Sequence, residues 1–517
     1  MNFSVFYFGP EGGPPGPVSP SFTLSIQPPA NTTGNDTCTP EIAGSHCEAD
    51  PDSNIYWGAY TTTGFSDGTP QQYVPIMARF NNEAELTWSQ WNGFEPPASA
   101  PAFSFNPQNW HYTNNIWFAQ GKIRSASGGA VNCPYIMAVN AADGTEVWSN
   151  LYGPSGNTSP ESGYTNLEWC GVNRANTDDS NIWMGGYTTR YNNGPAYTID
   201  PVDGSMSTGG RISGTYSFTS NFYCQDASGN RVISYTGGFS PNANTPQRPS
   251  NGMFTMNADM TSYTSSINSY NGSQTPQPTN YGLFNGGDNC YGLQAQTGDG
   301  KISLFACSMT DVRTVVHNVS LEDSTNHLHN PSLNTSFFNN TRSMDFDPDT
   351  NRMYFAYGQN TTQFNVCCYD FDDNQIVWQK TVTGNANTNG AGTDNQIGNN
   401  PSYGGLISCK LNGDNLLLSF TARVIPTSTT DDAGAGCVII QMPADGSADG
   451  DIGGYTVANS TRLSVGAEGS GTYANWFSGA YNPGGTSSSY AVPTDFDNQF
   501  AYDSIPDVDN LFVPTYF

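Results

Sequence analysis

The feature that most constrains this chain is an internal repeat. A turn rich in Asp, Asn and Gly is followed by a short run with an apolar, often aromatic, centre, and this unit recurs along most of the sequence. The apolar stretches of the repeated runs begin at Ile55, Ile116, Ile182, Val232, Ile302, Met353 and Leu416. These seven copies follow one another at a mean step of about 60 residues. Such a period indicates one supersecondary unit stacked many times.

Each unit carries the pattern of four short antiparallel strands. A short strand precedes the repeated run, and several copies continue into a third strand, an Asp-Gly or Asn-rich turn and a fourth strand. This continuation is clearest in residues 76–88, 135–148 and 366–378. Asp-Gly and Asn-Gly pairs between apolar runs are strong hairpin signals. The sequence therefore predicts an all-β fold, a β-propeller of about seven four-stranded blades, because radial repetition leaves only short, protected sheet edges.

The propeller is predicted to span residues 38–458, with one appendage on each side. Residues 1–37 contain a Pro/Gly-rich run at 9–17 that is unsuited to a sheet, so we expect an extended N-terminal arm. Residues 459–517 are expected to form a C-terminal strand and tail segment. Strand-like runs occur in both appendages, one of them at residues 22–26, and either end could supply the strand that closes the ring.

The composition excludes several classes of protein. Of the 517 residues, 16 are Lys or Arg and 44 are Asp or Glu, which gives a net charge of −28, and 13% are aromatic. A helical bundle needs more Ala, Leu, Glu and Lys, and a disordered chain carries few aromatics. So few cations form no basic face, and we therefore expect no nucleic-acid partner and no membrane insertion. The first residues lack the basic and apolar stretches of a signal peptide, so no leader is expected.

The 11 cysteines are too few for a disulfide scaffold and are odd in number. Cys38 and Cys47 flank a short loop and could pair. Cys367 and Cys368 are adjacent, and neighbouring side chains in a strand point to opposite faces, so one is expected to pack inward and the other outward. The sequence leaves open whether either pair is oxidised.

The tryptophans fall into three groups. The unit that ends in Asp143-Gly144-Thr145-Glu146-Val147-Trp148 resembles the blades of quinoprotein and BamB-like propellers, in which a Trp at this place packs between neighbouring blades. The resemblance implies this role for Trp88, Trp148 and Trp378. Three more recur at nearly equivalent second-strand positions and are predicted to lie in the core between blades, namely Trp57, Trp117 and Trp183. The candidates for contact with a partner or a glycan, with packing as the alternative, are those outside the repeats, Trp91, Trp110 and Trp476.

No catalytic set and no cofactor site is predicted. Quinoprotein dehydrogenases carry an adjacent disulfide beside the cofactor, but Cys367 and Cys368 lie in a third-strand pattern, and no calcium or quinone ligands accompany them. The Ser-x-Asp-x-Gly-x-Thr-Trp turns of sialidase-type propellers are missing from the sequence. Glycosidases need two carboxylates at a set separation, which a sequence with 44 acids does not single out. We therefore expect a protein that is not an enzyme.

The metal candidates are weak. His327 and His329 would share one face of an extended segment but have no evident third ligand, so exposed loop histidines are expected. The carboxylates that resemble the start of a calcium loop are Asp345, Asp347 and Asp349. That loop lacks the Gly expected at its sixth position and the Glu at its twelfth, so a turn between strands is the better interpretation.

Three phrases, residues 54–61, 74–81 and 469–473, resemble virion structural proteins of marine tailed bacteriophages, chiefly those of cyanobacteria. The resemblance implies a tail-associated role as fibre, nozzle or adhesin, in a virion assembled in the host cytoplasm. The implied partners are other virion proteins, further copies in an oligomer or ring, and a host surface glycan or protein. The acidic composition suits salty surroundings, where charge is strongly screened. Two alternatives stay open: a carbohydrate-binding surface or secreted propeller, and a propeller enzyme of the hydrolase or quinoprotein kind.

Overall fold

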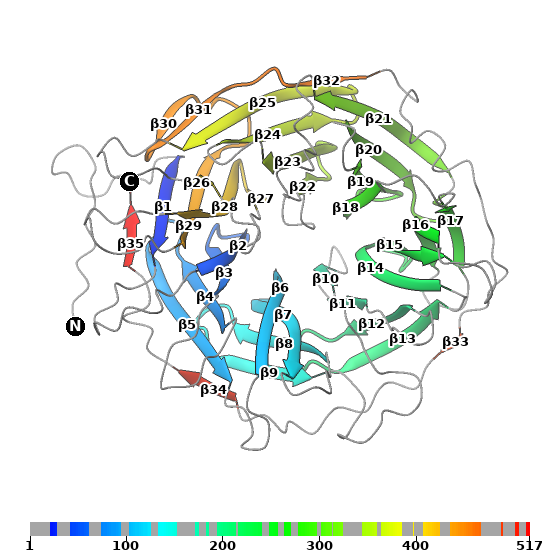
Figure 1. Cartoon of the computed structure of the whole chain (residues 1–517), viewed down its shortest axis with the longest axis horizontal. Coiled ribbons are helices and arrows are strands. Elements are labelled where there is room, and N and C mark those ends of the chain that lie inside the picture. The colour runs from blue at the N-terminus through cyan, green and yellow to red at the C-terminus, as the bar shows by residue number, and fades with distance from the viewer. Residues whose placement is uncertain are drawn as a thin grey trace.

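The computed structural model shows a ring of antiparallel sheets around a central axis (Figure 1). The residues that the structure describes are 21–27, 42–61, 74–94, 103–125, 133–151, 171–174, 182–185, 194–212, 216–239, 248–256, 263–269, 278–296, 301–312, 314–323, 344–358, 363–384, 396–397, 407–423, 435–466, 488–489, 502–505 and 513–516. Within these ranges the regular structure is all strand, and no helix there has the length and apolarity to cross a membrane. The predicted β-propeller is confirmed.

Each sheet is a blade whose strands follow one another as an up-and-down meander from the axis outward. Blade 1 contains β2 (Ile42–Ala49), β3 (Ile55–Thr61), β4 (Val74–Phe80) and β5 (Leu86–Phe94). Blade 2 contains β6 (Phe103–Thr113), β7 (Ile116–Ser125), β8 (Cys133–Asn140) and β9 (Glu146–Leu151). Blade 3 contains β10 (Gly171–Arg174), β11 (Ile182–Gly185), β12 (Gly194–Ile199) and β13 (Met206–Ile212).

The remaining blades follow the same plan. Blade 4 contains β14 (Tyr216–Gln225), β15 (Arg231–Phe239), β16 (Arg248–Met256) and β17 (Tyr263–Ser269). Blade 5 contains β18 (Pro278–Asn285), β19 (Asn289–Gln296), β20 (Lys301–Ser308) and β21 (Val315–Asp323). Blade 6 contains β22 (Met344–Asp347), β23 (Arg352–Gly358), β24 (Gln363–Asp370) and β25 (Gln375–Gly384). Blade 7 contains β27 (Ile407–Asn412), β28 (Asn415–Arg423) and β29 (Ala435–Pro443), and the short β26 (Gln396–Ile397) also pairs with β28.

The fourth strand of blade 7 comes from the N-terminal part of the chain. β1 (Phe22–Gln27) pairs antiparallel with β29, in a register that places Phe22 opposite Gln441 and Ile26 opposite Cys437. Its apolar residues Phe22, Leu24 and Ile26 are buried in one cluster with side chains of blades 7 and 1. The ring is therefore closed by residues 22–26, one of the two candidates that the sequence left open. Residues 1–20 and 28–37 of the expected arm lie outside the described ranges.

The strands that the structure describes after β29 lie on the outside of the ring, and we call them the C-terminal belt. They are β30 (Gly450–Ile452), β31 (Tyr455–Asn459), β32 (Leu463–Val465), β33 (Ser488–Ser489), β34 (Tyr502–Ile505) and β35 (Val513–Tyr516). β31, β32, β33, β34 and β35 pair with the outermost strands of blades 6, 5, 3, 1 and 7 in turn. Figure 1 shows them on the outer rim, in the reverse of the blade order. The belt covers sheet edges that would otherwise offer unpaired backbone groups to other chains.

One predicted repeat copy is placed differently in the structure. Ile302 lies on β20, the third strand of blade 5, whereas the other six repeat positions begin second strands. The second strand is β19, and the turn before it contains Gly287 at a φ of +85°. Asp299-Gly300-Lys301 has the same turn-and-strand pattern but precedes the third strand of blade 5. For this reason the pattern predicted a second strand where the structure has the third.

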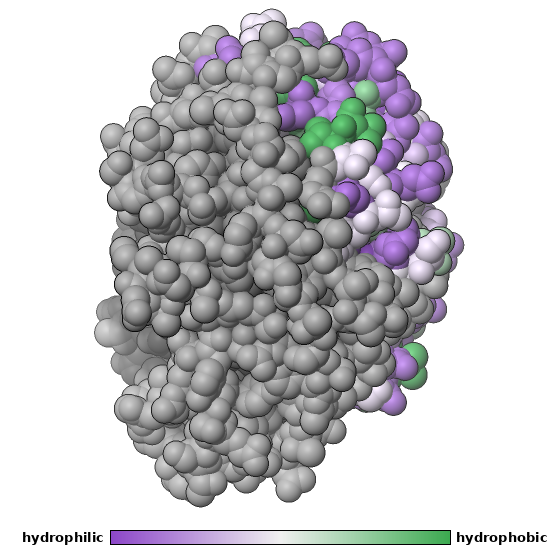
Figure 2. Space-filling model, turned by 90° about the vertical axis from the view of Figure 1, so that its right-hand side faces the viewer, coloured by the Kyte–Doolittle hydropathy of each residue, from purple (hydrophilic) through white to green (hydrophobic). Residues whose placement is uncertain are grey.

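The short turns that the structure describes share one face of the ring, because alternate turns of a meander lie at the same end. In these turns, acidic side chains accept hydrogen bonds from the backbone. Asp50 Oδ1 accepts the N–H groups of Asp52 and Asn54, and Asp226 Oδ1 accepts those of Ser228 and Asn230. Figure 2 shows the described residues gathered along one side of the disc, most of them hydrophilic. Where side chains are described, every Lys and Arg is at least partly buried, so the exposed ionic groups of this face are acidic.

Candidate functional site

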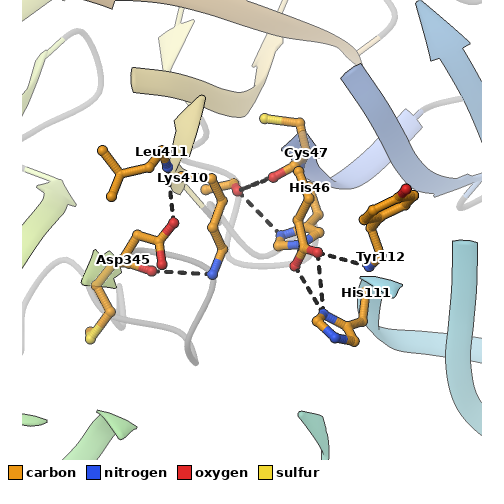
Figure 3. Close-up of polar contacts among 10 residues, drawn as sticks. His46, Cys47, His111, Tyr112, Asp345, Lys410 and Leu411 are labelled. Carbon is orange, nitrogen blue, oxygen red and sulfur yellow. Dashed lines mark hydrogen bonds and ion pairs between the residues drawn. The ribbon is translucent and has the colours of Figure 1, made fainter. Parts of the chain in front are cut away.

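Innermost strands of neighbouring blades bring polar side chains together around the axis of the ring. β2, β6, β22 and β27 lie nearest the centre (Figure 1). Figure 3 shows His46 and Cys47 of β2 beside His111 and Tyr112 of β6. Residues from blades 1, 2, 6 and 7 thus meet within one polar region, which is the candidate site.

Glu48 of β2 is the centre of this group. Its carboxylate lies 3.0 Å from His46 Nε2 and 3.2 Å from His111 Nδ1, and it accepts the backbone N–H of Tyr112 at 2.8 Å. The Glu48 side chain is 14% exposed and that of His111 8%, whereas that of His46 is 2%. The carboxylate therefore ties blade 1 to blade 2 through His111 and Tyr112 and contacts His46 of its own strand, all in a largely dry environment.

The two histidines keep Glu48 ionised. Burial alone would raise the pKa of this carboxyl, but the attraction and hydrogen bonds of His111 and His46 outweigh burial and hold its pKa well below the usual range. An ionised carboxylate has no proton to donate, so both imidazoles donate to it. In a neutral His111 the proton then sits on Nδ1, and Nε2 is the basic nitrogen.

Ser408, His46 and Glu48 follow one another in the order of a hydrolase triad. Ser408 Oγ lies 3.2 Å from His46 Nδ1, and His46 Nε2 contacts Glu48. Ser408, however, has no exposed surface, and its hydroxyl also lies 3.3 Å from the carbonyl oxygen of Cys47. A nucleophile must reach a substrate atom. This Ser–His–Glu chain is therefore a buried link between blade 7 and blade 1.

Blade 2 holds several buried polar atoms that lack a hydrogen-bond partner in the part of the chain that the structure describes. They are Trp110 Nε1, His111 Nε2, Thr113 Oγ1 and Trp117 Nε1. His111 Nε2 differs from the others because its partner atom Nδ1 is already fixed by Glu48. A carboxylate–imidazole pair of this kind leaves a base at Nε2, the arrangement that general-base catalysis uses.

Blade 6 makes the same kind of contact with blade 7. Asp345 lies directly opposite Tyr354 in the β22–β23 pair, as Glu48 lies opposite Tyr56. Asp345 Oδ2 accepts the backbone N–H of Leu411 at 2.9 Å (Figure 3). A carboxylate of one innermost strand thus holds the next innermost strand at two joints of the ring.

The tryptophans of the fourth strands lie between blades. The indole N–H of Trp88, Trp148 and Trp378 donates to a carbonyl of the next blade, that of Ala141, Pro201 and Ala444, at 3.0, 2.9 and 2.9 Å. Each ring covers a glycine of the same turn, and a Cβ on that glycine would meet the ring; these glycines are Gly144, Gly204 and Gly446. Their φ angles of +75°, +73° and +78° also favour glycine.

The other tryptophan positions divide between the core and residues outside the described ranges. Trp57 and Trp117 are fully buried. Of the two alternatives for Trp110, contact surface and packing, the structure shows packing: Trp110 is 3% exposed, stacks on Trp117 at 6.1 Å and packs on Gly58, so its ring is core. Trp183 and Trp91 lie on β11 and β5 with side chains that the structure does not describe, and Trp476 lies outside the described residues.

The metal candidates are placed as follows. Asp347 Oδ1 accepts the N–H of Asp349 and its Oδ2 the hydroxyl of Thr350, while Asp345 bonds across to blade 7. These carboxylates form a turn, and His327 and His329 lie outside the described residues. Among the residues searched, those that the structure describes, no group of three or more His, Cys, Asp or Glu could hold a metal ion.

Cys367 and Cys368 are both buried as free thiols. Cys367 packs in the cluster shared with blade 5 and Cys368 in the cluster shared with blade 7, so the two side chains point to opposite faces. Cys47 is also a buried free thiol, and Cys38 lies outside the described residues.

Sequence reasoning missed the axial group of His46, Glu48, His111, Ser408 and Lys410. One signal was present: two of the five histidines, His46 and His111, fall on the short strands that precede repeated runs. That signal does not show which strands lie side by side, because it is the packing of neighbouring blades that brings His46 and His111 together.

No family model matches this sequence, and no curated protein matches it. Solved structures are similar to its fold. An α-L-arabinanase of Penicillium chrysogenum is 9% identical at a TM-score of 0.40, over 69% of this chain and 99% of that one. A europium-containing methanol dehydrogenase is 10% identical at 0.38, over 81% and 93%, and the phage phi92 endosialidase is 10% identical at 0.38, over 82% and 69%. At this distance the likeness concerns the propeller fold and carries no argument about chemistry.

One expectation from the sequence is corrected. A protein without enzymatic activity was expected, but the similar structures just described are enzymes of glycan cleavage and of methanol oxidation. We therefore do not retain the non-enzymatic expectation. The likeness of the blades to those of quinoprotein propellers holds at the level of the fold.

Proposed function

We propose that this protein is a tail-associated component of a tailed-phage particle, located in the virion. The observation that carries the proposal is the C-terminal belt, which ties down the outer strands of several blades and ends on the strand that closes the ring. A component that works outside a cell must resist unfolding and edge-to-edge association. The belt serves both needs, because it covers sheet edges and links distant blades through one segment.

Side chains as well as backbone hold the first part of the belt. Gln379 of blade 6 forms two hydrogen bonds of 2.9 Å with the backbone of Leu463. Arg462 pairs with the buried carboxylate of Asp323 in blade 5 at 3.2 Å, and Lys380 Nζ donates to Asn459 Oδ1 at 2.7 Å. Ion pairs and reciprocal amide bonds in partly buried places hold a strand more firmly than exposed ones.

The acidic turn face supports a role in salty surroundings. With a net charge of −28 and no fully exposed cation where side chains are described, this face repels itself at low ionic strength. Salt shortens the range of that repulsion to about 8 Å at 0.15 M and less at higher concentration. We infer that its partners are other virion proteins and further copies of this chain, with a host surface glycan or protein as the external contact.

The proposal is tested on purified particles of a phage that encodes this chain. Proteomic mass spectrometry is expected to find the protein at a fixed copy number relative to known tail proteins, and immunogold labelling to place it on the tail. Labelling of infected cells with none on particles would overturn the proposal.

The second candidate is a propeller enzyme with His111 as its general base. The observation in its favour is the Glu48–His111 pair, which fixes the tautomer and leaves Nε2 without a partner in the described residues. Because Nε2 is buried, a substrate would reach it only through local opening of the site. The test is release of reducing ends from bacterial surface polysaccharides, compared with His111→Gln and the matched surface variant Val202→Ala. Activity that is lost in the first variant and kept in the second would support it. Equal activity in both would contradict it.

A further inference from the structure

Two cysteines of blade 5 face each other across neighbouring strands. Cys290 of β19 and Cys307 of β20 are direct partners in the antiparallel register, and their sulfur atoms lie 3.1 Å apart. Neither residue has exposed surface, and both are free thiols. Cys224 of the neighbouring blade lies in the same apolar cluster, with its sulfur 3.8 Å from that of Met309.

This geometry suits a disulfide. Directly opposed residues of an antiparallel pair have Cα atoms about 4.5–5.5 Å apart. A disulfide spans Cα separations of about 4.4–6.8 Å and brings the sulfurs to about 2.05 Å. A shift of roughly 1 Å between two side chains that already touch closes the bond, with the strands kept in register. Cys367 and Cys368, which face different clusters, have no such approach.

We propose that Cys290 and Cys307 are a redox-active dithiol that a peroxide-class oxidant converts into a cross-strand disulfide. The Cys290 thiol loses its proton and the thiolate attacks hydrogen peroxide. The O–O bond breaks, a sulfenic acid and hydroxide form, and the hydroxide takes up the lost proton as water. The Cys307 thiol then attacks that sulfur, the S–O bond breaks, and the proton leaves with the hydroxyl group as water. In sum, two thiols lose two hydrogens, and one peroxide becomes two waters.

The surroundings favour Cys290 as the attacking sulfur. The neighbouring side chains of Cys224 and Cys307 hold the pKa of the Cys290 thiol well below its usual range despite burial. The same contact with Cys290 raises the pKa of the Cys307 thiol, as does burial, so Cys307 keeps its proton until the second step. Hydrogen peroxide is small enough to reach a packed core during local opening.

The consequence is a covalent link that forms when the protein meets an oxidant. The bond joins the second and third strands of blade 5 and encloses the loop between them. A cross-link that closes a loop restricts the unfolded chain, so the oxidised blade unfolds less readily. This inference concerns the chain itself and holds or fails apart from the proposed tail role.

The experiment uses the full chain, purified under reducing conditions and then exposed to hydrogen peroxide in its native state. Free thiols are alkylated in denaturant, and the digest is examined without reduction by mass spectrometry. We expect a peptide pair joined through residues 290 and 307, with the mass lowered by two hydrogens, and two fewer alkylated thiols per chain. The cross-link should vanish in Cys307→Ser and persist in Cys437→Ser, a matched control at another fully buried cysteine.

Three results would overturn the proposal: both cysteines still alkylated after peroxide treatment, sulfinic acid on either of them without a cross-link, or a cross-link from Cys290 to Cys224 in its place. All three results can be recognised in the wild-type digest, so the test does not depend on whether a serine variant folds.

Discussion

Two joints of the ring, between blades 1 and 2 and between blades 7 and 1, are built differently. At the first, Trp88 covers Gly144 of the next blade's turn and donates to the carbonyl oxygen of Ala141. At the second, the fourth strand is β1, which buries Phe22, and the residue at the glycine position of the next turn is Ala84 at a φ of +61°. The Trp–Gly contact that recurs at three joints is thus replaced where the ring closes.

The polar contacts differ in the same way. Blades 1 and 2 meet through the Glu48 carboxylate, and blades 6 and 7 through that of Asp345. At the closing joint, Ser408 of blade 7 reaches His46 and Cys47, and Ser45 contacts the hydroxyl of Ser419 and accepts the indole N–H of Trp57. The joints between blades 1 and 2 and between blades 6 and 7 share both the tryptophan and the carboxylate contact, whereas the joint that forms between distant segments uses other buried contacts.

The largest expected effect is at the closing strand. Leu24→Ala removes a fully buried side chain from the only element that completes blade 7, and such changes cost about 2–5 kcal/mol. We expect a clear drop in the urea midpoint, while Val147→Ala, at an exposed valine of an ordinary fourth strand, leaves it within error. An equal and small effect of both variants would show that β1 does not hold the ring closed.

The next effect concerns the Glu48 carboxylate. Glu48→Gln keeps an acceptor for Tyr112 but loses a charge-assisted bond to each histidine, at a cost of about 1.5–3 kcal/mol for bonds of this kind. Because the folded-state pKa of Glu48 lies below its unfolded value, its contribution is complete above the unfolded pKa of about 4.3 and is lost as pH falls through the folded pKa.

We therefore expect the stability gap between wild type and Glu48→Gln to be wide at pH 5 and narrower at pH 3, in urea titrations at both pH values. Glu85→Gln, at an exposed side chain of the same blade, serves as the control. A gap that does not change with pH would contradict the account of this joint.

A smaller effect on stability is expected to distinguish the turn of Gly144 from the turn of Ala84. Gly144→Ala places a Cβ against the Trp88 ring at a positive φ, a conformation that costs a non-glycine residue about 1–3 kcal/mol. Ala84→Gly in the equivalent turn relaxes such a φ and meets no tryptophan, so it should change stability by less than about 1 kcal/mol. Thermal unfolding of both variants at one scan rate gives the comparison, and similar losses in the two would remove the distinction between the joints.

The smallest effect is that of a single hydrogen bond. Trp88→Phe keeps an aromatic ring over Gly144 but loses the N–H donated to Ala141, a bond worth about 0.5–1.5 kcal/mol. The melting temperature should fall slightly, and Trp378→Phe should behave alike because its indole N–H donates to Ala444 in the same way. Unequal responses would show that the repeat is not energetically regular.

The fold could be predicted because it rests on local signals. Asp-Gly turns with glycine at positive φ, such as Gly144 and Gly446, and apolar runs of strand length mark hairpins directly in the sequence. The one misplaced copy, at Ile302, arose because Asp299-Gly300 imitates the turn that precedes a second strand.

The axial site could not be predicted because it depends on how the blades pack around the axis. Glu48 and His111 lie on different blades, and Ser408 reaches His46 only after β1 has joined the two ends of the ring. The sequence also left open whether an N-terminal or a C-terminal strand closes the ring, since both ends carry strand-like runs. The structure uses both ends, because β35 pairs with the outer edge of β1.

The register of the closing strand allows the most direct test of this account. Ile26 lies opposite the native Cys437, and both side chains are buried in the same cluster. Ile26→Cys should therefore form a disulfide with Cys437 on mild oxidation, detected as a linked peptide pair without reduction, whereas Thr23→Cys, opposite Ile440, should not. If the thiol at position 26 stays free or links to another cysteine, β1 does not close the ring as described here.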